Sequence, residues 1–240
     1  MAARAKGEVV SKKDEKLYLR QLQLGPMANY VYLVGDPETR KAVVVDPAWD
    51  VDAILDRLDR DGMTLVGALV THFHPDHIGG DLMGHHIIGI PELLAKRPVK
   101  IHVHKSEAEY IRRMFGLSPA DLSPTDGETS IEVGRVPLRV LHTPGHTPGS
   151  SCFLIGGNLI SGDTLFIGSC GRVDLPGASP EDLYYSLTEK LAKLPDDTVL
   201  YPGHDYASAK TSTIGNEKRS NVFMRFTRLE DFLRLMGYPG

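Results

Sequence analysis

VTHFHPDHIGG, residues 70–80, places three histidines and an aspartate within six positions, directly after an apolar run. The preceding stretch LVGALVT, residues 65–71, is nearly continuously apolar and of strand length, which is typical of a strand buried on both faces. Gly79 and Gly80 permit a tight loop behind the cluster. The histidines therefore stand at the carboxyl end of a strand, where open α/β sheets bind their ligands.

The polar residues of this stretch have the spacing of a metal site: His72, His74, Asp76 and His77. On a turn that leaves a strand, residues two positions apart can point the same way. Asp76 and His77 stand at the start of the next helix, so two pairs of ligands are aimed at adjacent points. Imidazole and carboxylate suit zinc, iron and manganese, whereas calcium requires oxygen ligands. The alternative is a polar loop whose histidines only form hydrogen bonds, but HxHxDH at a strand end favours a metal.

Three further candidate ligands follow strands later in the chain. They are His146 in TPGHTPG, Asp163 in SGDTLF and His204 in YPGHDY, and each is flanked by a glycine that lets the backbone bend or approach closely. Each alone could be a turn residue, but together with the first cluster they form a full ligand set. Structural or surface roles are expected for the other histidines, namely His85, His86, His102, His104 and His142.

The patterns around the first cluster predict a hairpin and a helix. NYVYLVG (29–35) and KAVVVDP (41–47) are β-branched or aromatic runs joined by a short polar turn. Apolar residues then recur at helical spacing from residue 51 to 58, with Asp50 placed to cap the helix and Gly62 to end it. This half therefore reads as strands, a helix and a strand that leads to the site loop.

The second half repeats this order. The short strands TSIEV, PLRVLHT, SCFLI and NLISGD precede a helix with Ser179 as its cap and Pro180 in its first turn. Capping-box patterns at 106–109 and 227–230 predict two more helices. We therefore expect one α/β domain over 17–240 made of two similar layers. Outside these layers we expect a flexible extension over 1–16, an insertion at about 81–105 that rims the site, and a short helical segment at the C-terminus.

Composition and charge exclude several classes of protein. The formal net charge is −4 with acidic and basic residues intermixed, so nucleic acid is not expected as a partner. No stretch approaches the roughly 20 apolar residues that cross a bilayer, and the start lacks a secretion signal. Cys152 and Cys170 form no metal or redox motif, which fits a reducing compartment. We expect a cytoplasmic protein with no membrane partner, and no oligomeric state is predicted.

The order HxHxDH, histidine, aspartate, histidine resembles the metallo-β-lactamase superfamily over roughly residues 25–210. The resemblance implies a four-layer αββα sandwich with two divalent metal ions, zinc first and iron or manganese as alternatives. One ion would be held by His72, His74 and His146, and the second by Asp76, His77 and His204. Asp163 would bridge the two ions. In such a site two metals lower the pKa of a shared water to about 7, so no serine or cysteine nucleophile is required.

Within the superfamily, GDTLFIGSCGRVDLPG and YPGHDY resemble glyoxalase II and the persulfide dioxygenases, which act on glutathione derivatives. The resemblance implies that Arg172 and Tyr206 contact the substrate, although a surface ion pair and simple packing are the alternatives. Asp174 stands where glyoxalase II has an aromatic residue, as in the persulfide dioxygenases. Phe73 and Pro75, by contrast, depart from the HCHADH of those enzymes.

The leading interpretation is a glyoxalase II-like dinuclear hydrolase that cleaves a thioester or ester with a metal-bridging hydroxide. Its catalytic residues would be Asp76 and Asp163, and its substrate would be a small molecule such as a glutathione or other thiol derivative. The alternative is a mononuclear iron persulfide dioxygenase that acts on glutathione persulfide, with iron on His72, His146 and Asp163. A binding protein with a vestigial site is a third possibility, which the full ligand set disfavours. β-Lactam cleavage is not expected, because no secretion signal is seen.

Overall fold

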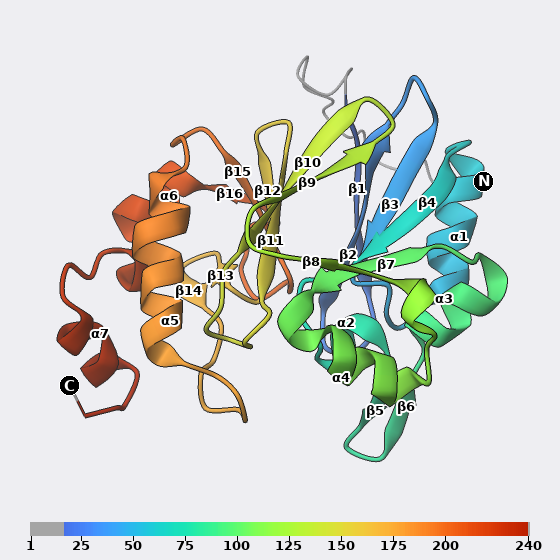
Figure 1. The fold of residues 1–240 in the computed structure, drawn as a ribbon. Coiled ribbons are helices and arrows are strands. Elements are labelled where there is room, and N and C mark those ends of the chain that lie inside the picture. Colours follow the sequence, from blue (N-terminus) through green and yellow to red (C-terminus); the bar gives the residue numbers. More distant parts are fainter. Residues whose placement is uncertain (1–16, 240) are drawn as a thin grey trace, which may run out of the picture.

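The computed structural model describes residues 17–239 and contains two six-stranded sheets (Figure 1). The expected extension over 1–16 lies outside the described residues. The first sheet consists, in spatial order, of β1 (Tyr18–Leu24), β2 (Asn29–Asp36), β3 (Lys41–Val45), β4 (Thr64–Leu69), β7 (Lys100–His104) and β8 (Leu122–Thr125). The second consists of β16 (Ser212–Thr213), β15 (Val199–Pro202), β12 (Asn158–Gly162), β11 (Ser151–Ile155), β10 (Val136–His142) and β9 (Thr129–Val133).

Helices cover the outer face of each sheet. Those of the first half are α1 (Val51–Arg60), α3 (Ile90–Lys96) and α4 (Lys105–Phe115), whereas the four-residue α2 (Pro75–Ile78) lies in the connection after β4. Those of the second half are α5 (Pro180–Tyr185), α6 (Ile214–Ser220) and α7 (Leu229–Leu235). Figure 1 shows α1 and α3 on one outer side of the molecule and α5, α6 and α7 on the other. Two small hairpins complete the fold, β5 (Gly80–Leu82) with β6 (His85–Ile87) and β13 (Leu165–Phe166) with β14 (Ser169–Cys170).

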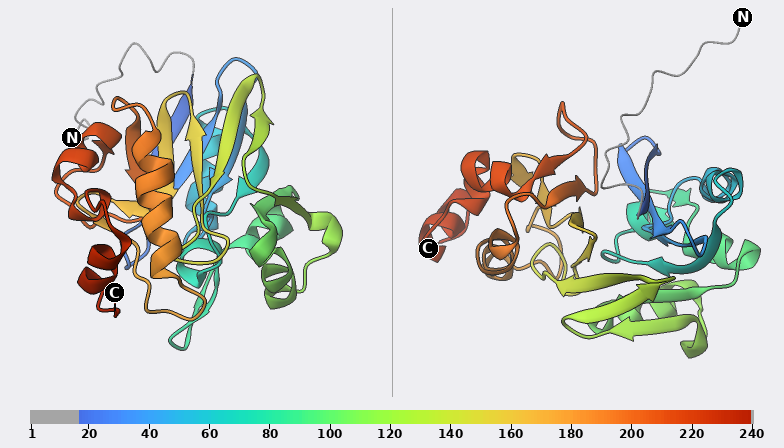
Figure 2. Two further views of the ribbon diagram at one scale, coloured as in Figure 1. Left: turned by 60° about the vertical axis from the view of Figure 1, so that its left-hand side comes forward. Right: turned by 90° about the horizontal axis from the view of Figure 1, so that it is seen from above.

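Three apolar layers hold these elements together, and strand β2 shows how. All of its residues are buried, because alternate side chains point to opposite faces of the strand. Val31 and Leu33 pack towards the helices of the first half, whereas Tyr30 and Tyr32 pack against the second sheet. A third apolar cluster joins the second sheet to α5, α6 and α7. The chain is thus a four-layer αββα sandwich, as expected, and Figure 2 shows its two halves side by side.

Several local predictions are confirmed. The hairpin of β2 and β3 and the four predicted strands β9 to β12 form, and the Asp50 side chain accepts from the Ala53 N–H at the start of α1. Ser179 caps α5 in the same way, and the helix continues through a π-helical stretch, Ser186–Lys190. Both predicted helices thus begin at the expected side-chain acceptor.

Two capping predictions are wrong. Helix α4 begins one residue before Ser106, because the His104 side chain accepts from the Ser106 N–H and so acts as the cap. Glu109, the other half of the expected capping box, instead pairs with Arg112 and Arg113 one turn later. Helix α7 is preceded by Arg228 without any side-chain cap, so the pair Thr227 and Glu230 does not form a capping box either.

The range 81–105 divides into two parts. Its last residues form β7, which lies inside the first sheet between β4 and β8, so this part belongs to the sheet rather than to a rim. The remainder forms the β5–β6 hairpin and α3, whose Ile90 and Leu93 are fully buried. None of the range lines the cavity beside the predicted ligands. Over residues 17–239, every helix is too short or too polar to cross a bilayer.

Candidate metal centre

The predicted ligands converge where loops from both sheets meet. The loop after β4 carries His72 and His74 into α2, which carries Asp76 and His77. Loops after β10, β12 and β15 bring His146, Asp163 and His204 from the second sheet. The predicted ligands form two groups, in each of which the candidate ligand atoms lie within 4.8 Å of one another: a first group of His72, His74 and His146, and a second of Asp76, His77 and His204. A third group that meets the same distance, Asp46, His72 and His77, includes an aspartate that was not predicted as a ligand.

Asp163 spans the two groups. Its Oδ1 lies 3.3 Å from Nε2 of His77, and its Oδ2 lies 3.4 Å from Nε2 of His204. The same Oδ2 is 3.7 Å from Nε2 of His146, which belongs to the other group. A glycine makes this placement possible, since a Cβ on Gly203 would stand 2.3 Å from Asp163 Oδ1. The predicted bridging position of Asp163 therefore agrees with its distances to both groups.

Hydrogen bonds at the outer ring nitrogens aim the histidines inward. Nδ1 of His146 lies 2.7 Å from the carbonyl oxygen of Arg172, and Nδ1 of His204 lies 3.0 Å from that of Met27. A carbonyl oxygen only accepts, so each Nδ1 carries the hydrogen and each Nε2 presents a lone pair. His72 has the same tautomer, because the Thr71 hydroxyl donates its hydrogen to Asp46 and therefore accepts from Nδ1 of His72, 2.9 Å away.

The donor atoms in the middle fit a cation. Nε2 of His72 and Oδ1 of Asp163 are buried without a hydrogen-bond partner, although such atoms are normally satisfied. Nε2 of His77 lies 3.2 Å from Nε2 of His204, and Nδ1 of His74 lies 3.0 Å from Nε2 of His146. A positive ion among converging lone pairs satisfies all these atoms at once, and imidazole with carboxylate is a donor set for zinc or iron.

The protonation states of the clustered histidines also favour a bound metal ion. Burial, together with the neighbouring histidines, holds the pKa of His72 well below its usual range and lowers that of His74 to about 4. Burial alone would lower the pKa of His77, but the carboxylates of Asp163 and Asp76 raise it well above the usual value. Two neutral imidazoles thus lie beside buried carboxylates that attract positive charge, as metal ligands do.

Supporting residues that the sequence analysis missed surround the second group. Asp46, just after β3, places Oδ2 2.9 Å from Nδ1 of His77 and also accepts from the Thr71 hydroxyl at 2.6 Å. Asn29 donates to Oδ2 of Asp76 at 3.0 Å and accepts from the Trp49 indole N–H at 3.0 Å. Asp46 has a sequence signal, since like Asp163 and His204 it directly follows a buried strand.

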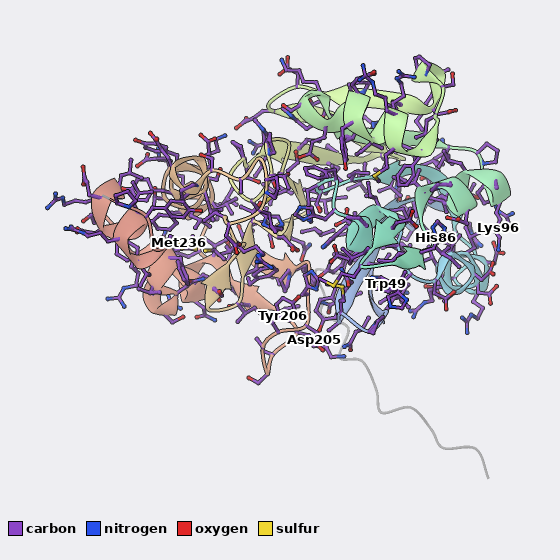
Figure 3. All side chains as sticks on the ribbon, turned by 90° about the horizontal axis from the view of Figure 1, so that it is seen from below. Trp49, His86, Lys96, Asp205, Tyr206 and Met236 are labelled. Carbon is purple, nitrogen blue, oxygen red and sulfur yellow. The ribbon has the colours of Figure 1, made fainter. Side chains whose placement is uncertain are left out.

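Arg172 and Tyr206 line a cavity of about 470 Å³ that also includes His146, Asp163 and His204. The Arg172 guanidinium forms two hydrogen bonds of 2.6 Å to Asp174, so an ion pair within the chain already engages it. Tyr206 is 63% exposed and stacks on His204, with ring centroids 4.6 Å apart. Figure 3 shows Tyr206 on the second half and Trp49 on the first, on the face seen from below. The expected substrate residues therefore lie beside the candidate metal ligands.

Comparison with known proteins places this arrangement among enzymes. A human protein named persulfide dioxygenase ETHE1, mitochondrial, is 33% identical over 225 residues, which cover 92% of this chain and 81% of the human one. A hydroxyacylglutathione hydrolase of Synechococcus sp. (strain JA-3-3Ab) is 35% identical over 243 residues, covering 87% of this chain and 89% of that protein.

A solved structure gives the same result. The crystal structure of ETHE1 from Myxococcus xanthus superimposes with a TM-score of 0.79 and 32% identity over 92% of this chain and 90% of that one. Residues 24–204 match the family described as Metallo-beta-lactamase superfamily. The fold, the ligand order and these comparisons agree: the chain belongs to the metallo-β-lactamase superfamily, with relatives in its glyoxalase II and persulfide dioxygenase branch.

Proposed function

We propose that this chain is a metal-dependent hydrolase that binds two divalent ions, zinc in the first place, and cleaves a thioester or ester. The observation that carries the proposal is that both ligand groups are complete and that Asp163 reaches each of them. The ligands of the second group are also held by hydrogen bonds, since Asp46 contacts His77 and Asn29 donates to Asp76. A group with no role as a metal site would leave this buried polar network without an evident purpose.

Each residue has a proposed task. His72, His74 and His146 would hold one ion, Asp76, His77 and His204 would hold the other, and Asp163 lies where it would serve both. Ions bound there would supply Lewis-acid chemistry, which lowers the pKa of a bound water and stabilises negative charge on a carbonyl oxygen. Asp76, fixed by Asn29, also orients the attacking water. The chain itself supplies the burial that strengthens these interactions.

The substrate is proposed to be a small thiol derivative, such as a glutathione thioester. The cavity of about 470 Å³ has the volume of a small-molecule site and opens directly onto the ligands. Arg172 is placed to meet a carboxylate of the substrate, for which it would share or exchange its bond to Asp174. The phenol of Tyr206 lies on the same cavity wall, where partial desolvation and the carboxylates of Asp163 and Asp76 raise its pKa to about 12, so it is a donor at neutral pH.

A second candidate is a persulfide dioxygenase with one iron on His72, His146 and Asp163. Two observations favour it: the human and Myxococcus relatives named ETHE1 cover nearly the whole chain, and Asp174 stands beside Arg172. Two histidines and one carboxylate are a donor set for iron that reacts with oxygen.

The metal content of the purified, untagged protein distinguishes the two. About two ions per chain, mainly zinc or manganese, with hydrolysis of a thioester or ester panel support the hydrolase. About one iron per chain, with oxygen uptake on glutathione persulfide, supports the dioxygenase. Asp163→Asn should remove metal and hydrolysis together, and the assignment of roles is wrong if both survive. No metal and no turnover would indicate a vestigial site.

A further inference from the structure

Helix α4 carries a buried carboxylate that the proposed reaction does not use. Glu107 is only 2% exposed, and it belongs to neither ligand group. Burial raises the pKa of its carboxyl to about 7, against hydrogen bonds that lower it. Removing a carboxylate from water costs several kcal/mol unless its partners compensate. What the side chain contacts is therefore informative.

One oxygen of Glu107 holds the loop that carries His146. Its Oε1 accepts from the Thr147 hydroxyl at 2.5 Å and from the Gly149 N–H at 2.8 Å. The approach is close, since a Cβ on Gly149 would stand 2.7 Å from Glu107 Cδ. Ser150 completes the loop by accepting from the Thr147 N–H at 3.0 Å. The residue next to the proposed ligand His146 is thus tied to α4.

The same helix also contacts the loop that carries His72 and His74. The Phe73 backbone N–H is near enough to Glu107 to lower the pKa of its carboxyl, although Oε2 has no hydrogen bond of full geometry. The ring of Phe73 packs edge-on against Tyr110 of α4 and against His74, with centroids 4.9 Å apart in both cases. Both loops that supply the first ligand group therefore meet the N-terminal half of α4.

We propose that Glu107 is a positioning residue that fixes the His146 loop against the His72–His74 loop and thereby sets the affinity of the first group for its metal. The inference rests on the proposed metal site but not on the reaction. Glu107 acts through Thr147, Gly149 and the Phe73 backbone and touches neither metal nor substrate. Supporting residues of this kind change metal affinity by about 10–100-fold when they are removed.

The test compares zinc dissociation constants, measured by chelator competition, for Glu107→Ala, Glu107→Gln and Thr147→Val. The matched control is Glu109→Gln on the same helix, because Glu109 is exposed and pairs only with surface arginines. We expect Glu107→Ala to weaken binding by about 10–100-fold, Glu107→Gln and Thr147→Val by less, and the control not at all.

Two backgrounds assign the effect to one group. With His204→Ala the second group is disabled, and Glu107→Ala should still weaken zinc binding at the first group. With His72→Ala the first group is disabled, and Glu107→Ala should leave zinc binding at the second group unchanged. A uniform loss in both backgrounds would overturn the proposal, since it would indicate a general structural role.

Folding is checked by circular dichroism and thermal unfolding in excess chelator. If Glu107→Ala does not fold, Glu107→Gln and Thr147→Val decide, and wild-type affinity in both overturns the proposal. Weakened binding without any hydrolysis by the wild type would overturn the proposed reaction but support this role. Hydrolysis by the wild type, together with unchanged zinc affinity in the Glu107 and Thr147 variants, would support the proposed reaction and overturn this role of Glu107.

Discussion

Nδ1 of His77 lies 2.9 Å from Oδ2 of Asp46, and both side chains are buried. The carboxylate also accepts from the Thr71 backbone N–H at 2.8 Å, so its position is held independently of His77. This pairing leaves Nε2 of His77 facing Asp163, 3.3 Å away. Asp46 therefore orients a proposed ligand of the second group without entering either proposed set of ligands.

We predict that Asp46→Asn weakens the second ion, because an amide orients the imidazole less firmly than a carboxylate. The expected loss of affinity is about 10–100-fold, measured by chelator competition. Asp36→Asn is the control, since Asp36 is equally buried but pairs with Arg135 instead. It should lower the temperature of unfolding and leave metal affinity unchanged. Equal affinities in both variants would contradict the prediction.

Trp49 should report on metal binding through its fluorescence. It is the only tryptophan in the chain and is linked to Asp76 through Asn29, by two hydrogen bonds of 3.0 Å each. Binding at Asp76 draws electron density from the carboxylate, so zinc added to metal-free protein should change the emission. Asn29→Ala breaks the link and should reduce the change. If the protein binds zinc to saturation and the Trp49 emission stays constant, the prediction is wrong.

The Arg172–Asp174 ion pair should control the Michaelis constant rather than the turnover number. Arg172→Met removes the guanidinium and should raise KM for an acidic thioester about tenfold, since a charged hydrogen bond contributes roughly 1.5 kcal/mol or more. Asp174→Ala releases the guanidinium and should lower KM for the same substrate. A neutral thioester of similar size serves as the control. If both thioesters respond alike, Arg172 does not bind the carboxylate.

Both cysteines should resist thiol reagents in the native protein. Burial raises the pKa of Cys152 to about 11 and that of Cys170 to about 12, so neither forms the reactive thiolate near neutral pH. Labelling with a chromogenic disulfide reagent at pH 8 should be slow until guanidinium chloride unfolds the chain. Because Cys170 lines the cavity, fast labelling of one native thiol would instead identify it as reactive.

The stability of the metal-free protein should depend on Glu107 between about pH 4.5 and 7. Burial raises the pKa of this carboxyl from its ordinary 4.5 to about 7. The folded chain therefore keeps a proton that the unfolded chain has released, and the free energy of unfolding falls as pH rises through this window. In Glu107→Gln the free energy of unfolding lacks this pH-dependent contribution, because glutamine does not ionise.

The difference between the two proteins isolates Glu107, because every other titratable group is present in both. Urea unfolding in excess chelator should give curves that diverge by at most about 3 kcal/mol across the window. Asp46 adds a smaller charge effect on the same carboxyl. Parallel curves would mean that Glu107 ionises in the fold as it does in the unfolded chain.

The ligand set could be predicted from the sequence because its members lie within a few residues of the ends of strand patterns. The carboxyl ends of neighbouring strands meet at one edge, so local signals near His72, Asp163 and His204 sufficed to bring them together. The supporting residues could not be found in this way. Trp49 has a φ of 74°, which no pattern predicts for a tryptophan, and Glu107 lies in an ordinary amphipathic helix.

The wrong predictions have a similar origin. A capping box depends only on residues three apart, so the sequence offered Ser106 and Glu109 as readily as any true cap. What decided the start of α4 was β7, which delivers His104 to the helix from within the sheet. The sequence pattern also assigns this strand to an insertion, because its position in the sheet depends on pairing with β4 and β8, which no local pattern reveals.

Each proposed ion takes ligands from both sheets, since His146 and His204 come from the second and their partners from the first. If the proposed ions bind, their binding should therefore be thermodynamically coupled to the association of the two halves. An ion at roughly 1,000 times its dissociation constant would add about 4 kcal/mol to the association of the halves. A chain whose second sheet has not formed would offer only part of each proposed ligand set, so we expect it to hold an ion more weakly than the assembled sandwich does.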